Sequence, residues 1–271
     1  MPVEPLFASL RDLQLYLLAG AFVLARLGGF MLMMPLFSRV PLSGLLRNGV
    51  ALALAVPILP MLMHTLAGQQ IGGAMIVIYI LKELLVGIAL GLAMGVPFWA
   101  AEAAGDILDL QRGSSMGTLI DPMMTHETSA TGTLLAIVMI AVYLAAGGLE
   151  LSLNAVYDSY GLWPVERLMP VFSRDAAGIF LELLNQLLKM ALTLVFPLIV
   201  SMLLSDIVLA FVARASPHFN VFSLSLIVKT LVFSFVFVLY AAFLLSYMSR
   251  DLGFLHEAIR QIKLLSCADC S

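Results

Sequence analysis

The sequence predicts an all-α membrane protein built from several apolar helices. Of its 271 residues, 62% are hydrophobic and only 11% are charged, and the mean hydropathy is +1.04. Soluble domains contain roughly 45–50% apolar and about 25% charged residues. The length accommodates around six spans of about 20 residues each, joined by short connections. The composition therefore predicts a polytopic helical protein that lacks a soluble domain large enough for a catalytic module.

Charge distribution and motif content exclude several functional classes. The net charge is −3 and no two basic residues are adjacent, so the electrostatic footprint of a nucleic-acid-binding protein is missing. The four histidines lack metalloprotease spacing, and no glycine-rich phosphate-binding motif occurs. Cys267 and Cys270 form an isolated pair, whereas a tetrahedral zinc site needs four ligands. We expect no enzymatic activity, no cofactor, no metal site and no nucleic-acid partner.

The first part of the chain predicts one continuous span and one interrupted span. Residues 13–37 form the first apolar run, and residues 38–49 are a polar, short amphipathic connection. Residues 50–66 are apolar but contain Pro57 and Pro60. Proline removes a backbone donor and clashes one turn back, so this segment should be kinked or broken.

Residues 71–101 form the longest apolar run and carry a ladder of small residues. Gly87, Gly91 and Gly95 recur at four-residue spacing, which places them on one helical face. Faces of this kind allow close helix packing in membranes. The ladder therefore predicts tight packing against another helix, with a surface for a neighbouring subunit as the alternative.

The central segment, residues 102–133, interrupts the apolar pattern with Gly, Ser, Thr and Met residues. Irregular backbone facing lipid costs several kcal/mol per unpaired group, so this segment must be solvated or held by protein. Glu102, Asp106 and Asp109 share one face if the preceding helix continues to Gln111. The carboxylates of that face must then contact water or pair with other polar groups. No nucleophile or base of complementary type accompanies these carboxylates, which disfavours a catalytic site. A proton or cation path remains an alternative.

The rest of the chain predicts three more spans and a helical tail. Residues 134–153 form the first of these spans, and residues 154–175 form a loop whose aromatic and basic residues suit a membrane interface. Residues 179–212 and 224–248 form the other two. Apolar residues recur at helical spacing after residue 251, which predicts an amphipathic tail.

Charged residues inside the predicted spans are candidates for functional or interface positions, because such residues face protein or water rather than lipid. Adjacent residues on a helix point in different directions, so Lys82 and Glu83 should each pair with another helix. The set of intramembrane charges comprises Arg26, Lys82, Glu83, Lys189, Asp206 and Lys229.

Two stretches resemble the T/R subunit family of type III secretion export gates. The first, residues 102–135, resembles the family's acidic helix end followed by a Gln-x-Gly segment, a small or apolar loop and Asp-Pro. The second, residues 203–232, resembles the family's Arg-x-x-Pro-x-x-Asn-Val-Phe connection, which precedes a helix beginning near Lys229. The matching residues are Glu102, Gly105, Gln111, Gly113, Asp121 and Pro122 in the first stretch, and Arg214, Pro217, Asn220, Val221 and Phe222 in the second.

The resemblance implies an architecture that hydropathy alone does not predict. Residues 1–175 would form a P-like portion of helical hairpins, and residues 176–271 a Q-like hairpin with the amphipathic tail. This single subunit would assemble with P/R-type and Q/S-type subunits into a helical channel in the bacterial inner membrane. Its other implied partners are the switch-type (U, FlhB-like) and large (V, FlhA-like) export-apparatus subunits, membrane lipid and unfolded secreted proteins in transit. The intramembrane charges would then pair across subunits.

The resemblance also implies a functional site. The protein would help to form and close a channel for unfolded secreted proteins, and details of the central segment favour the injectisome T branch over the flagellar R branch. Glu102, Asp106 and Asp109 would form an acidic helical base below the plug. The implied plug across the channel comprises Arg112, Gly113, Ser114, Ser115, Met116, Gly117, Thr118, Leu119, Ile120, Asp121 and Pro122.

A proton-coupled secondary transporter of a small solute is the alternative function. It would use the three carboxylates of the central segment, or Lys82 and Glu83, near a discontinuous helix. The sequence shows no matching broken segments in its two halves, which disfavours this alternative.

Overall fold

The computed structural model describes residues 4–39, 43–67, 71–113, 129–167, 176–215, 221–255 and 258–260. Within these ranges the chain forms helices and turns without a β-strand, which confirms the all-α class. Four helices are long and apolar enough to cross a membrane, or up to six spans if two interrupted helix pairs are each counted as one. The chain is therefore an all-α polytopic membrane protein.

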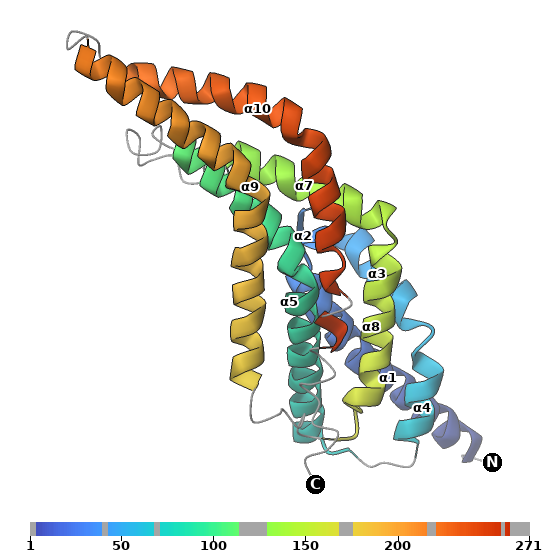
Figure 1. Cartoon of the computed structure of the whole chain (residues 1–271). Coiled ribbons are helices and arrows are strands. Elements are labelled where there is room, and N and C mark those ends of the chain that lie inside the picture. The colour runs from blue at the N-terminus through green and yellow to red at the C-terminus, as the bar shows by residue number, and fades with distance from the viewer. Residues whose placement is uncertain are drawn as a thin grey trace. The chain divides into compact units, whose positions relative to one another are not determined.

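The helices belong to two compact units, each assembled from segments distant in the sequence (Figure 1). The first unit comprises residues 1–95, 149–181 and 255–271, and the second comprises residues 96–148 and 182–254. The first contains α1 (Glu4–Met33), α2 (Pro35–Arg39), α3 (Gly44–Ala55), α4 (Leu59–Leu66), the first part of α5 (Gly73–Arg112) and nearly all of α8 (Gly148–Leu162). The second contains the rest of α5, α7 (Ala130–Ala145), most of α9 (Ala176–Ala215) and α10 (Val221–Asp251).

Helices α1 and α5 cross backbone to backbone in the first unit, at glycines on both helices. A Cβ added at Gly87 would lie 2.0 Å from the Arg26 carbonyl oxygen, and one at Gly91 would lie 2.6 Å from that of Phe30. From the other side, a Cβ at Gly29 would lie 2.3 Å from the Leu84 carbonyl oxygen. The predicted helix packing is thus confirmed for Gly87 and Gly91, and their partner is a helix of the same chain.

The predicted break between residues 50 and 66 is confirmed. Helix α3 ends at Ala55 and α4 begins at Leu59, with a bend of 62° between them. The segment at 38–49 is less irregular than expected, because α3 already begins at Gly44. Ser43 precedes this helix and its hydroxyl accepts a hydrogen bond from the Leu46 amide, as a helix N-cap does.

The prediction of one continuous span over residues 134–153 is wrong. Helix α7 ends at Ala145, and α8 begins at Gly148 and continues to Leu162, through the first part of the predicted loop. Gly147 lies in the break with φ +73°, a conformation that glycine adopts without steric cost. The polar residues of α8 made it resemble a loop, although its buried face includes Ser152 and Ser159.

Helix α5 continues to Arg112, so the first part of the predicted central segment is helical. This confirms the condition under which its three carboxylates share one face. In the second unit, α9 and α10 form a long hairpin, visible as the two orange and red helices of Figure 1. Pro197 lies inside α9, and the chain is helical on both sides of this proline.

Candidate functional site

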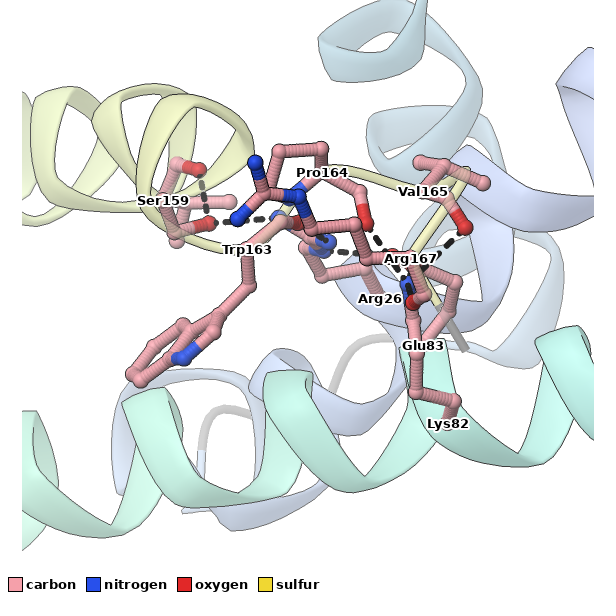
Figure 2. Close-up of polar contacts among 9 residues, drawn as sticks. Arg26, Lys82, Glu83, Ser159, Trp163, Pro164, Val165 and Arg167 are labelled. Atoms are coloured by element: carbon pink, nitrogen blue, oxygen red, sulfur yellow. Dashed lines mark hydrogen bonds and ion pairs between the residues drawn. The ribbon is translucent and has the colours of Figure 1, made fainter. Parts of the chain in front are cut away.

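Arg26 of α1 is fully buried and its guanidinium is held on every side (Figure 2). Its Nε donates to Glu83 Oε2 at 2.6 Å, one terminal nitrogen donates to Ser159 Oγ at 2.9 Å, and the other donates to the Trp163 carbonyl at 2.8 Å. The guanidinium carbon also lies 3.8 Å from the centre of the Tyr160 ring. A buried charge is tolerated under these conditions, because its hydrogen-bonding groups have partners.

Lys82 completes this buried ion cluster, which we define as Arg26, Lys82 and Glu83. Its ammonium lies 2.7 Å from Glu83 Oε1 and donates to the carbonyl oxygens of Pro164, Val165 and Arg167 at 3.0–3.2 Å. Figure 2 shows these side chains converging at the end of α8. Two cations face one carboxylate, and the backbone carbonyl dipoles compensate the remaining positive charge.

The buried ion cluster fastens three segments of the first unit together. Arg26 belongs to α1, Lys82 and Glu83 belong to α5, and the carbonyls belong to the chain that leaves α8. Glu83 pairs with Arg26 of another helix, as the sequence predicted. Lys82 instead contacts the backbone that follows α8 and pairs with Glu83 itself. All three charges are therefore compensated within this chain, whereas the resemblance implied pairing across subunits.

Asp109 is the centre of a second polar cluster, in the second unit. Its carboxylate accepts hydrogen bonds from the hydroxyls of Ser129 and Thr131 at 2.7 and 2.6 Å and from the Thr131 amide at 3.0 Å. It also pairs with Arg112 at 2.5 Å. We call Asp109, Arg112, Ser129 and Thr131 the Asp109 clasp. The clasp joins the carboxyl end of α5 to the amino end of α7.

The clasp also caps α7. The Ser129 hydroxyl accepts from the Gly132 amide at 2.8 Å while it donates to Asp109, so both of its roles are fixed. A carboxylate beside the first amides of a helix is favoured by the helix dipole. The two helices also approach closely at Gly105, where an added Cβ would lie 2.3 Å from Gly132 Cα. Gly105 is one of the residues on which the resemblance rests.

The three carboxylates of the predicted acidic face differ in their surroundings. Asp109 is 5% exposed, whereas Glu102 and Asp106 are half-buried. A Cβ added at Gly132 would lie 2.5 Å from Asp106 Oδ1 and 3.0 Å from the Glu102 carbonyl oxygen. This face of α5 is therefore directed at α7 of the same unit.

Lys229 of α10 links the hairpin to the end of α5. Its ammonium lies 2.8 Å from Asp206 Oδ2 of α9 and donates to the Gln111 carbonyl at 3.4 Å. Ser225 donates to the other carboxylate oxygen of Asp206 at 3.2 Å. Asp206 and Lys229 thus pair within the chain, and the same contact brings α10 to the residue before the clasp's Arg112.

The remaining predicted site residues are isolated or lie outside the described residues. Lys189 and Arg214 are exposed, and neither forms an ion pair within the described part of the chain. Val221 and Phe222 begin α10, but their side chains are not among those described. The residues outside the described ranges are Pro217, Asn220 and the plug residues Ser114, Ser115, Met116, Gly117, Thr118, Leu119, Ile120, Asp121 and Pro122, together with Cys267 and Cys270.

Sequence reasoning missed four residues that the structure brings into these clusters. Ser159 lies on a helix predicted as a loop. Phe233, whose ring centre lies 4.7 Å from the Arg112 guanidinium carbon, has no distinguishing pattern in its apolar run. Ser129 and Thr131 could have been predicted, because a Ser just before an apolar run is an N-cap signal.

The hydroxyl, carboxylate and basic groups of both clusters bond to one another, so the arrangement holds segments in place. Within the described ranges, no group of three His, Cys, Asp or Glu side chains could hold a metal ion.

Comparison with known proteins finds a matching family model and several relatives of similar length. A sequence model of the family described as bacterial export proteins, family 1, matches residues 17–254. The chain is 33% identical over 238 residues to the Yop proteins translocation protein T of Yersinia pestis, an alignment that covers 86% of this chain and 90% of that protein.

Two further relatives have other names. The chain is 31% identical to the secretion system apparatus protein SsaT of Salmonella typhimurium, over 83% of this chain and 90% of that protein. It is 28% identical to the flagellar biosynthetic protein FliR of Bacillus subtilis, over 82% and 85% of the two chains. Identity is thus higher to the translocation and secretion proteins than to the flagellar one.

Proposed function

The chain belongs to family 1 of the bacterial export proteins, and from this membership we propose that it is a structural and gating component of a type III secretion export gate. Its relatives are named for translocation, for a secretion apparatus and for flagellar biosynthesis. The higher identity to the first two supports the injectisome branch. In this role the protein lies in the bacterial inner membrane and lines part of a channel for unfolded secreted proteins.

The assembly follows from the same proposal. The P-like portion, residues 1–175, and the Q-like portion, residues 176–271, pack against P/R-type and Q/S-type subunits. The switch-type and large export-apparatus subunits adjoin this gate. Energy for export comes from an ATPase and from proton-driven work in partner subunits, since this chain carries no phosphate-binding motif.

The local task of the chain is to close the channel with the plug, residues 112–122. One observation carries this part of the proposal: the Asp109 clasp holds residues on both sides of the undescribed stretch 114–128. Arg112 precedes it, Ser129 and Thr131 follow it, and one buried carboxylate bonds to all three. A segment that closes a pore needs fixed ends, and the clasp joins Arg112 at the end of α5 to Ser129 and Thr131 at the start of α7.

Deleting Ser114–Leu119 tests the plug while leaving every clasp residue in place. We expect the shortened protein to assemble with its partner subunits and the complex to show raised ion conductance in its closed state. The measurement is the potassium and chloride conductance of the purified complex in planar bilayers. Unchanged conductance in a correctly assembled complex would contradict the plug.

The transporter alternative loses support from the helix interruptions. Both interrupted pairs, α3 with α4 and α7 with α8, precede residue 176, and the helices α9 and α10 are continuous. Transporters with broken helices carry them at corresponding positions of two repeats. The described interruptions do not follow that pattern.

A further inference from the structure

One face of α10 holds the carboxyl end of α5. Leu226, Lys229 and Phe233 follow one another at spacings of three and four residues, which places them on the same side of the helix. Each contacts one of the last residues before the undescribed stretch 114–128. We call these three residues the α10 bracket.

The three contacts of the α10 bracket differ in chemistry. A Cβ added at Gly113 would lie 2.5 Å from Leu226 Cδ2, so the apolar side chain covers this glycine closely. Lys229 donates to the Gln111 carbonyl at 3.4 Å. The Arg112 guanidinium carbon lies 4.7 Å from the centre of the Phe233 ring, within the range of a cation–π interaction.

The position of Lys229 suits its contact with α5. The last four carbonyls of a helix lack partners within it, and a cation near that end is favoured by the helix dipole. Gly113 has φ +77° and its amide bonds to the Leu110 carbonyl, so the helix ends here in a turn. Lys229 therefore satisfies a carbonyl that the helix leaves open.

Helix α9 fixes the orientation of this lysine. Asp206 pairs with the Lys229 ammonium at 2.8 Å, and Ser225 donates to the other oxygen of the same carboxylate at 3.2 Å. Both helices of the hairpin thus take part in the contact with the end of α5.

We propose that Lys229 and Phe233 are positioning residues, through which the α9–α10 hairpin fixes residues 111–113 at the carboxyl end of α5. This inference rests on the proposed function, in which Arg112 and Gly113 belong to the plug, and it assigns the hairpin a part in holding them. The hairpin acts on residues 111–113, whereas the Asp109 clasp joins Arg112 to Ser129 and Thr131.

A series of substitutions at Lys229 separates this role from a merely structural one. Lys229→Met removes the ammonium and keeps an unbranched apolar side chain of similar length, and Lys229→Arg keeps a cationic donor. The double variant Asp206→Lys with Lys229→Asp restores an ion pair within the hairpin but places an acceptor opposite the Gln111 carbonyl. Lys189→Met, on the exposed face of α9, is the matched control.

The readout is the closed-state potassium and chloride conductance of the purified complex, measured beside the Ser114–Leu119 deletion. We expect raised conductance for Lys229→Met and for the exchanged pair, and wild-type conductance for Lys229→Arg and Lys189→Met. Wild-type conductance of the exchanged pair would overturn the inference, because an ion pair within the hairpin would then suffice.

Phe233→Leu decides the matter if Lys229→Met fails to assemble. It removes the ring beside Arg112 and keeps an apolar side chain at a buried position, so we expect assembly with raised conductance. Wild-type conductance of this variant would count against the bracket.

If the deletion raises the conductance while the bracket variants do not, the inference is wrong and the proposed function stands. If the deletion does not leak, the proposed plug itself is wrong.

Discussion

Two charged residues at buried positions account for much of the polar organisation of the chain. Arg26 in the first unit and Asp109 in the second each have several partners from other segments. A charge in such surroundings costs several kcal/mol to desolvate, and only complete hydrogen bonding offsets that cost. Each therefore specifies how the segments around it must pack.

Glu83→Gln tests the buried ion cluster. The substitution leaves the cations of Arg26 and Lys82 without a compensating charge, and breaking a buried ion pair costs roughly 3–5 kcal/mol. We expect a lower unfolding temperature of the purified complex, measured by differential scanning fluorimetry. Glu182→Gln removes an exposed carboxylate of α9 and serves as the control, with an unfolding temperature close to wild type. Equal stability of the two variants would show that the cluster is not a stabilising element.

Asp109→Asn tests the clasp. The amide keeps one acceptor oxygen but presents a donor where the carboxylate accepted, and Arg112 loses its charged partner. We expect normal co-purification with partner subunits and raised closed-state conductance, because Arg112 is no longer joined to Ser129 and Thr131. Asp158→Asn, at an exposed position of α8, should conduct as wild type does. A tightly closed Asp109→Asn complex would remove the main support for the plug.

The sequence identified these charges but not their partners. Composition and periodicity predict that Arg26 and Glu83 face protein or water, because lipid excludes them. They do not predict Ser159 or the Trp163 carbonyl, which lie 133 and 137 residues from Arg26 along the chain. Such contacts depend on how helices cross, and one sequence without related sequences contains no direct record of that.

Helix crossings in the first unit depend on glycines at single positions. Gly28 and Gly29 are neighbours in α1, yet a Cβ at Gly28 would meet nothing within 4 Å, whereas one at Gly29 would lie 2.3 Å from the Leu84 carbonyl oxygen. The carbonyl belongs to the backbone of α5 and cannot turn aside. The difference between these two positions makes the crossing testable.

Gly29→Ala should therefore destabilise the protein, while Gly28→Ala should not. The first substitution forces α1 and α5 apart and disturbs the buried ion cluster between them. The second replaces glycine by a better helix former and gains up to about 1 kcal/mol. Unfolding temperatures of the two purified variants give the comparison. Similar values would mean that the helices do not cross at Gly29.

At the scale of elements, sequence patterns predicted most of the helices but misplaced several of their boundaries and missed the break between α7 and α8. The prolines at 57 and 60 marked the break between α3 and α4, and the long apolar runs marked α5, α9 and α10. The break at Gly147 was missed because apolar residues continue on both sides of it. The adjacent Gly147 and Gly148 were the available signal, since paired glycines mark turns.

For the whole molecule, the exposure of α10 indicates a large apolar surface that is not covered by the described parts of the chain. Within an apolar stretch of 18 residues, only 6% of α10 is buried, compared with 44% for the corresponding stretch of α1. Large apolar side chains such as Phe235, Val238 and Phe243 are exposed there. Lipid or other subunits must cover them, and in the proposed function other export-gate subunits form part of that cover.

The central claim is that this protein works as one subunit of an export gate, and purification from detergent tests it most directly. We predict that the full chain co-purifies with P/R-type and Q/S-type subunits in a stable complex. Alone in liposomes it should catalyse no solute uptake under a proton gradient. A stable lone protein with substrate-dependent uptake would contradict the account and favour a proton-coupled transporter.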